Sequence, residues 1–576
     1  MGKRLLFVIG YSLFSVVLSF SVALLVSCGP KLPTDYDEAD SLPKIYPDYT
    51  DVTIPVNIAP LTFVLDEEAD EMIARYSVGS AEIVCTEKMQ PDIDDWRSLV
   101  QAAMTADGGQ AKAGGDIQAD VYARHGDRWL HYRPFQIHVS PDSIDPWMSY
   151  RLIPPSFISY EALTISQRCL EDYDERVVYD NMLCGLEKDG QCINCHSYQQ
   201  FDPERMQFHA RQSHGGTVIA YDGILRKINM KHDSILSAGV YPAWHPWLRY
   251  IVYSSDNTVQ SFHTTDKNKI EVYDTASDLI AYDIDRGEVM NIENDPDEME
   301  VFPAWAPDGR TLYYCSAHFV RNDSIKNVSI DVASRIDTLR YSLYRKSFDP
   351  ETKQFGPREL VSLLSPLPIP EEDSDLSPLT SHLSIALPRV SPDGRYLLFS
   401  AADHGYFHIW HHDADLWIVD LSRCEVRGTG YEDSLSAEGN LVPRTSHLVP
   451  RNVPRTSHLV PRRIDEVNSD DTESYHSWSS NSRWIVFSSR RNDGVFTRPF
   501  FAHIDDNGHF GKPFELPSAD PLYHRQMMRS YNIPEFMRGP VTIDPHTFAS
   551  ILKSDGEPVK YGGYKTNQET TTDLTN

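Results

Sequence analysis

Short runs of aromatic and aliphatic residues, separated by tight polar turns, dominate the second half of the chain. The runs 250–255, 312–316, 396–400 and 484–489 each follow such a turn, and two of these turns read Pro-Asp-Gly-Arg. Glycine and asparagine tolerate the positive φ that these turns need, so each unit predicts a β-hairpin. A second hairpin follows each first one, and two hairpins make one four-stranded blade of a β-propeller.

These units resemble the TolB-like propeller repeat, whose pattern is approximately Pro-x-Trp-Ser-Pro-Asp-Gly-Arg followed by a strand. The matching segments begin at Pro242, Pro303, Pro388 and His476, and the resemblance covers residues 215–517. It implies a TolB-like, WD-repeat-like β-propeller over that range. The segments start 61, 85 and about 88 residues apart, whereas one blade takes roughly 40–45 residues. Insertions or diverged blades therefore lie between them, and the number of blades stays open.

Strand-like segments also fill residues 49–157, with one short helix expected near residues 94–103. About six strands over this length favour a small β-sandwich-like domain, with a diverged propeller blade as the alternative. The predicted fold class is all-β: an N-terminal β-sandwich-like domain, then the propeller. A C-terminal extension and tail is expected over residues 518–576.

Cys192-Ile193-Asn194-Cys195-His196 forms the pattern C-x-x-C-H, by which c-type haem is attached to proteins. The thiols of Cys192 and Cys195 would bond to the haem vinyl groups, and His196 would supply an axial nitrogen. Only 46 residues separate His196 from Pro242, which is too short for a separate cytochrome domain. We therefore predict a small haem-motif segment, residues 158–214, held against the propeller.

The second axial ligand of such a haem would come from a nearby side chain. His209 is the first candidate and Met206 the second, with His214 as a further option. Methionine ligation raises the haem potential, whereas a second histidine lowers it. Three alternatives to haem stay open: a Cys192–Cys195 disulfide, a zinc site that adds Cys184 to the motif, and chance occurrence of a short pattern.

The N-terminus predicts export and a lipid anchor. Lys3 and Arg4 precede an apolar run that ends at Val26, and Leu25-Val26-Ser27-Cys28 looks like a bacterial lipobox. By that resemblance residues 1–28 form a lipoprotein signal peptide, and Cys28 carries the lipid. The alternative is an uncleaved transmembrane anchor. Residues 29–48, rich in proline and acidic side chains, are expected to be a tether.

Composition narrows the class of partner. The chain has 576 residues, more than one ordinary domain needs, and its net charge is −30. An acidic protein of this kind does not bind nucleic acid through its charge. Aromatic residues make up 11% of the chain, which suits an all-β fold.

The whole layout resembles a group of TolB-like lipoproteins with an embedded C-x-x-C-H motif, of the kind found in Bacteroides-type bacteria. Its marks here include Tyr150–Pro154, Asn194–Ser197 and Phe208-His209. The resemblance implies an architecture in the cell envelope, with the outer membrane favoured, and no settled activity.

Two functions follow from these observations. The first is a lipid-anchored haem protein that transfers electrons or senses redox state, with a protein partner on the propeller. The alternative is a non-redox propeller scaffold that binds proteins or glycans, with Cys192 and Cys195 as a structural disulfide. No G-x-S-x-G nucleophile motif of the serine hydrolases occurs in the chain, so a serine hydrolase is not expected. Peroxidase activity at a five-coordinate haem with an open distal side stays open.

Overall fold

The computed structural model describes residues 30–576, except for 87–88, 106–113, 155–161, 186–190, 365–378, 423–458 and 565–576. Cys28 and the apolar run before it lie outside the described residues, so the predicted lipid anchor stays a prediction. No helix among the described residues combines the length and the apolar character that crossing a membrane requires.

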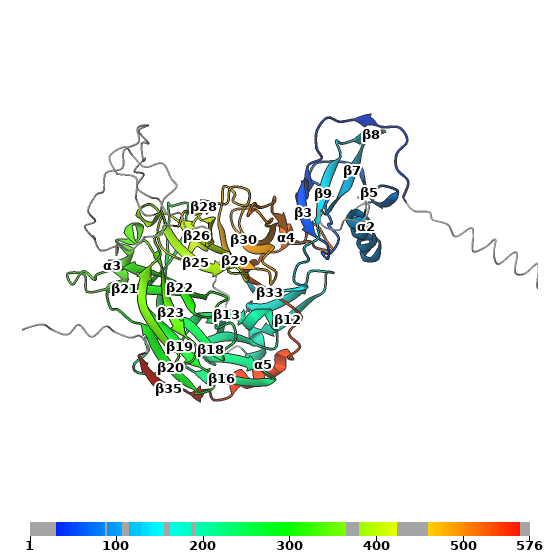
Figure 1. The fold of residues 1–576 in the computed structure, drawn as a ribbon. Helices are drawn as coiled ribbons and strands as arrows, with labels where there is room; N and C mark the ends of the chain where they lie inside the picture. Colours follow the sequence, from blue (N-terminus) through cyan, green and yellow to red (C-terminus); the bar gives the residue numbers. More distant parts are fainter. Residues whose placement is uncertain are drawn as a thin grey trace, which may run out of the picture.

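The N-terminal domain is built on one main sheet and one helix (Figure 1). The sheet follows the order β1-β8-β7-β5-β6, and β9 pairs with both β7 and β3. Its strands are β1 (Asp37–Glu38), β3 (Val52–Pro55), β5 (Glu71–Val78), β6 (Ala81–Thr86), β7 (Gly115–His125), β8 (Arg128–His131) and β9 (Phe135–Ser140). A small second sheet pairs β2 (Ile45–Tyr46) with β4 (Val64–Leu65). Part of the predicted tether is therefore built into this domain.

Helix α2 (Ile93–Thr105) packs on the main sheet. It buries Trp96, Leu99, Val100 and Ala103, whose spacing places them on one helical face. The sequence predicted a β-sandwich here, but a helix covers the main sheet where the second large sheet of a sandwich would lie. The cause is local: the acidic residues of its first turn and the 3.6-residue apolar period favour a helix over another strand.

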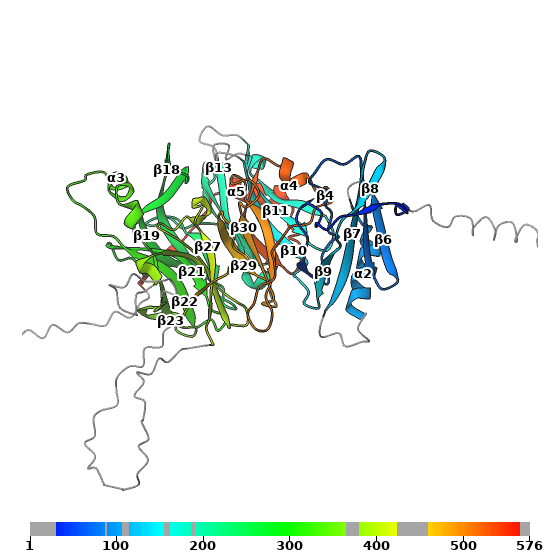
Figure 2. The same ribbon diagram turned by 90° about the horizontal axis from the view of Figure 1, so that it is seen from above.

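The rest of the described chain forms a six-bladed β-propeller, which confirms the predicted all-β class and propeller (Figures 1 and 2). The innermost strands of the six blades are β33 (Ser530–Met537), β13 (Gln191–Tyr198), β17 (Val240–Trp244), β21 (Glu298–Trp305), β25 (Ser384–Val390) and β29 (Glu473–Trp478). Each of these strands contacts the next, and β33 contacts β13, so the six close into a ring.

Three or four further strands complete each blade. Blade 1 adds β10 (Trp147–Ile153), β11 (Thr164–Cys169) and β12 (Glu175–Asp180), and blade 2 adds β14 (Met206–Gln212), β15 (Gly216–Tyr221) and β16 (Ile224–Asn229). Blade 3 adds β18 (Tyr250–Phe262), β19 (Ile270–Asp283) and β20 (Glu288–Glu293), and blade 4 adds β22 (Thr311–His318), β23 (Ser342–Asp349) and β24 (Gln354–Leu360). Blade 5 adds β26 (Tyr396–Ala402), β27 (Asp415–Asp420) and β28 (Arg462–Arg463), and blade 6 adds β30 (Trp484–Ser489), β31 (Arg498–His503) and β32 (Phe514–Glu515).

Both ends of the propeller sequence contribute to its first blade. Strand β33 comes from the C-terminal region and pairs with β10, nearly 400 residues earlier. The propeller therefore begins at β10, not at residue 215, and ends after β33, not at residue 517. Helix α5 (Pro545–Lys553) then packs on blades 1 and 2, and β34 (Glu557–Pro558) and β35 (Lys560–Tyr564) extend the outer edges of blades 2 and 3.

All six inner strands share one irregularity. Each has a β-bulge at which one residue other than glycine adopts a positive φ between 44° and 55°: Cys195, Tyr241, Phe302, Leu387, Tyr475 and Ile533. The next residue is proline in four blades and histidine, His196 or His476, in two. A bulge re-aims side chains at a strand end, and most of these residues join the apolar cluster of blades 4 and 5.

The N-terminal domain packs against blades 6 and 1. One apolar cluster joins Trp96 and Ile137 of the domain to Trp484, Phe501 and Tyr531 of the propeller. In Figure 1 the domain lies on the side of the propeller that carries α4 and β33, and in Figure 2 it lies beside β10. The two parts are therefore one packed body in the described structure.

Candidate functional site

A cavity of about 330 Å³ opens at one end of the ring of inner strands. Blades 1, 2, 3 and 6 line it with residues from the N-terminal parts of their inner strands or from other strands and loops of the same blades. A loop of blade 5 closes one side. Its polar lining includes Arg151, Asn194, Arg211, Gln260, Thr258, Arg490, Thr497, Ser530 and Asn532, and its apolar lining includes Tyr241, Phe407, Ile409 and Trp410. This volume lies in the range typical of small-molecule sites.

A second, smaller cavity of about 200 Å³ is lined by residues that follow the bulges, among them Pro242, Trp244, Trp305 and Trp478. Because all inner strands run in the same direction around the ring, the two cavities lie at opposite ends of it. The bulge residues Phe302, Leu387, Tyr475 and Ile533 pack between these ends. The ring is therefore filled at its centre.

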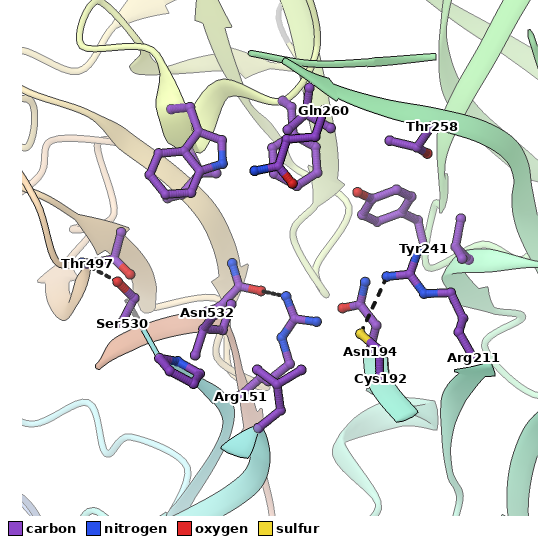
Figure 3. A pocket seen from close by; sticks show the side chains of 18 of the residues that line it. Arg151, Cys192, Asn194, Arg211, Tyr241, Thr258, Gln260, Thr497, Ser530 and Asn532 are labelled. Atoms are coloured by element: carbon purple, nitrogen blue, oxygen red, sulfur yellow. Dashed lines mark hydrogen bonds between the residues drawn. The ribbon is translucent and has the colours of Figure 1, made fainter. Parts of the chain in front are cut away.

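Three arginines give the larger cavity its charge. Arg151, on β10, is buried and donates from Nη1 to the carbonyl of Ile193 at 3.1 Å and from Nη2 to Asn532 Oδ1 at 2.9 Å. Its Nε has no partner. Figure 3 shows Arg151 and Arg211 on either side of Asn194 and Cys192, directed toward the same space.

Arg490 lies on the blade 6 side of the cavity. It is buried, its guanidinium carbon stands 4.0 Å from the ring centroid of Trp410, and its Nε has no partner. Burial lowers the pKa of Arg490 to about 10 and also lowers that of Arg151. Among the described residues, no salt bridge joins Arg151, Arg211 or Arg490 to a carboxylate.

Nearby carboxyl groups offset this charge only in part: Asp471 and Asp493 act to raise the pKa of Arg490, but neither forms a salt bridge with it among the described residues. Burial raises the pKa of Asp256 well above its usual range and that of Asp274 to about 7, so both carry less negative charge near neutral pH than an exposed aspartate does. Tyr406 donates from its hydroxyl to Asp274 Oδ1 at 2.9 Å. The cavity is thus a positively charged space with an aromatic side.

The C-x-x-C-H motif is part of β13 and not of a separate insert. Cys192 lines the cavity, where Arg211 Nη2 stands 3.8 Å from its sulfur. Cys195 and His196 are 1% exposed and lie outside the cavity lining, at the bulge. Burial raises the pKa of the Cys195 thiol and lowers that of His196 to about 3.

These positions do not fit a haem. A covalent c-type haem needs both sulfurs and the imidazole to face one space, whereas here only Cys192 faces the cavity. The reason is that side chains on a strand alternate between two faces, and the bulge turns Cys195 and His196 into the packed ring. We derive no redox step from this geometry, and covalent attachment stays a prediction.

The other predicted site residues are also dispersed. Met206 is fully buried in the apolar cluster beside helix α5, and His209, on the opposite face of β14, contacts Thr217 Oγ1 at 3.0 Å through Nδ1. Tyr179 donates from its hydroxyl to the sulfur of Cys184 at 3.1 Å. Within the described chain Cys192 and Cys195 are free thiols, so the structure does not contain the disulfide that was left open as an alternative to haem. The alternative zinc set of Cys184, Cys192, Cys195 and His196 does not converge on one point among the described residues, whereas Glu271, His404 and His411 do.

No motif in the sequence indicates the cavity arginines or the pair His404 and His411. Arg151 and Arg490 are separated by more than 300 residues and come together only when the ring closes. A usable signal existed for β13: His196-Ser197-Tyr198 matches His476-Ser477-Trp478 of a recognised repeat.

No family model matches the chain, and no curated protein matches it in sequence. Among solved structures it is similar to TolB from Acinetobacter baumannii, with 12% identity, a TM-score of 0.37 and coverage of 77% of this chain and 85% of that one. It is also similar to prolyl oligopeptidase B from Galerina marginata, with 10% identity, a TM-score of 0.29 and coverage of 88% and 62%. It is similar as well to a puromycin-hydrolyzing peptidase of Mycobacterium tuberculosis, with 8% identity, a TM-score of 0.26 and coverage of 64% of this chain and 39% of that one. At these values the assignment of a propeller rests on the six blades themselves and on the closed ring of their inner strands.

Proposed function

We propose that this protein is an exported, lipid-anchored binding protein whose propeller takes an anionic ligand into the arginine-lined cavity. The ligand class is a small molecule or chain end that carries a carboxylate or phosphate. One observation carries the proposal: three arginines face a cavity without a carboxylate partner among the described residues. A buried charge without a counter-charge is costly, and a bound anion would supply one.

The rest of the lining supports this class of ligand. Asn194, Asn532 and Gln260 offer amide groups, while Trp410 and Phe407 offer flat apolar surfaces. Guanidinium groups bind carboxylate and phosphate through two parallel hydrogen bonds, so they fix the orientation of an anion as well as its charge. The lipid on Cys28 would hold this cavity at a membrane of the cell envelope.

A binding panel tests the proposal. The full chain is titrated calorimetrically with inorganic phosphate, citrate and glucuronate, and Arg490→Met and Arg151→Gln are compared with the surface control Arg249→Gln. We expect at least one probe to bind the wild type and the control equally well and the two cavity variants about 30-fold more weakly. Equal binding by all four proteins, or by none, would contradict the proposal.

The covalent haem is tested separately. A pyridine haemochrome spectrum of denatured, acid-acetone-washed protein from a host with cytochrome c maturation would show c-type absorbance if haem is attached. Loss of that absorbance in the Cys192→Ala/Cys195→Ala double variant would establish the attachment. A colourless wild type would remove the electron-transfer function and leave the binding function unaffected.

A further inference from the structure

A second group of side chains lies at the edge of this cavity, on two segments far apart in the sequence. Glu271 belongs to the outer part of the long β18–β19 hairpin of blade 3, and His404 and His411 belong to the loop that follows β26 in blade 5. His411 Nε2 is 3.1 Å from Glu271 Oε1, and His404 Nε2 is 3.4 Å from Glu271 Oε2. The three potential ligand atoms all lie within 4.8 Å of one another.

These spacings suit a tetrahedral metal ion. Zinc binds imidazole nitrogen and carboxylate oxygen at about 2.0–2.2 Å, which places neighbouring ligand atoms about 3.3 Å apart at the tetrahedral angle. His411 Nε2 is 3.1 Å from Oε1 of Glu271 and His404 Nε2 is 3.4 Å from Oε2, so each imidazole nitrogen lies near that spacing from one of the two carboxylate oxygens. Two histidines and one carboxylate are a common ligand set for divalent first-row transition metals.

The surroundings hold the group in place. The side chains of His411 and Glu271 are almost completely buried, whereas that of His404 is 19% exposed. Gly405 adopts a φ of +66°, and a Cβ there would stand 3.3 Å from the His411 ring and 3.5 Å from Glu271 Oε1. A side chain at this position would therefore crowd the site.

A third histidine and the exposed part of His404 border the group. His263, whose side chain is 38% exposed, places its Nε2 3.9 Å from Glu271 Oε2. The fourth position of a tetrahedral ion would thus face His263 and solvent. A metal would reach the site from this side.

We propose that Glu271, His404 and His411 bind a divalent transition metal ion of the zinc class. The ion would fasten the β18–β19 hairpin to the blade 5 loop. Thr258, Gln260 and Val272 of the hairpin and Phe407 and Trp410 of the loop form walls of the cavity. Metal binding therefore fixes the shape of the cavity, and the site itself does not depend on which ligand the cavity takes.

Metal content and affinity test this proposal on the full chain. The protein is stripped with EDTA and dialysed, Zn²⁺ binding is measured by calorimetry, and bound zinc is counted by mass spectrometry after gel filtration. We expect one Zn²⁺ per chain and a rise in Tm on adding it. Glu271→Gln and His404→Ala should each weaken Zn²⁺ binding at least about tenfold. Even removing a residue that only hydrogen-bonds to a metal ligand weakens metal binding by about that factor.

His412→Ala is the matched control. His412 is the next residue in the same loop, but its Nδ1 faces Asp471 at 2.7 Å, outside the group. Far-UV circular dichroism without metal checks that each variant folds, and the partly exposed His404 is the position most tolerant of change. Wild-type affinity in His412→Ala with loss in the other two supports the site. No stoichiometric binding by the wild type, or unchanged binding by His404→Ala, overturns it and leaves a plain glutamate–histidine ion pair.

Discussion

Replacing His476 by proline should make the protein more resistant to acid. His476 follows the bulge residue Tyr475 on β29, and four other blades have proline at the same position. Residues 475 and 476 fall within the bulge, between the paired residues Ser474 and Ser477. A proline there removes no ladder pairing and suits a backbone that the other blades already adopt.

The magnitude comes from the pKa of the buried imidazole. Burial and the nearby Arg389 lower the pKa of His476 from 6.5 to about 3 in the folded protein. The unfolded chain takes up a proton as the pH falls through 6.5, whereas the folded protein does not, so stability is lost on acidification. At about pH 5 this one histidine lowers the free energy of unfolding by about 2 kcal/mol relative to neutral pH.

Urea unfolding of wild type and His476→Pro, followed by tryptophan fluorescence at about pH 7.5 and about pH 5, measures this difference. The stability of the variant relative to wild type should rise by about 2 kcal/mol between the two pH values. Other buried histidines, including His209 and His408, are present in both proteins and cancel in the comparison. The same pH dependence in both proteins would show that His476 is protonated in the folded state and would refute the reasoning.

Three further variants probe the fold and the cavity. Arg490→Met should keep the packing on Trp410. Without ligand it should raise the free energy of unfolding by about 1 kcal/mol, as measured by urea unfolding. Any anion found in the calorimetric panel should bind this variant about 30-fold more weakly. Gly309→Ala should lower the free energy of unfolding by at least about 1 kcal/mol more than Gly394→Ala does, as measured by thermal unfolding. Both glycines have a positive φ, but only a new Cβ at Gly309 would stand 2.3 Å from the Trp247 ring. A chain ending after residue 529 lacks β33 and should be insoluble, whereas one ending after residue 564 should keep the wild-type Tm.

Local sequence patterns were enough to predict four blades but not the other two. The four recognised units each combine a bulge and a short turn within fifteen residues, and these elements report directly on a hairpin. In blade 2 the turn between β13 and β14 runs from Gln199 to Arg205, with positive φ at Gln200 and Phe201, so the familiar turn is absent. Blade 1 has no local signature, because its inner strand β33 comes from the other end of the propeller.

The candidate sites show the same limit. Cys192 was singled out because its motif is short and contiguous, and it does line the cavity. Arg151, Arg490 and Glu271 lie on separate blades, and nothing in their local sequence distinguishes them from surface residues. His404 and His411 could have been noticed as part of a histidine-rich loop, but their ligand geometry depends on a hairpin more than 130 residues away.

The propeller repeat gives a second physical explanation for the motif that first suggested haem. Cys195-His196-Ser197-Tyr198 occupies on β13 the place that Tyr475-His476-Ser477-Trp478 occupies on β29, including the bulge and the positive φ. His196 therefore has a structural role that needs no iron. Attaching a haem would require Cys195 and His196, each 1% exposed, to turn out of the packed ring. Haem attachment and the packing of this bulge thus compete for the same residues. His196→Pro separates them: a protein that keeps its wild-type Tm with proline at this position uses the histidine as a propeller residue, whereas one that loses both c-type absorbance and stability uses it as a ligand.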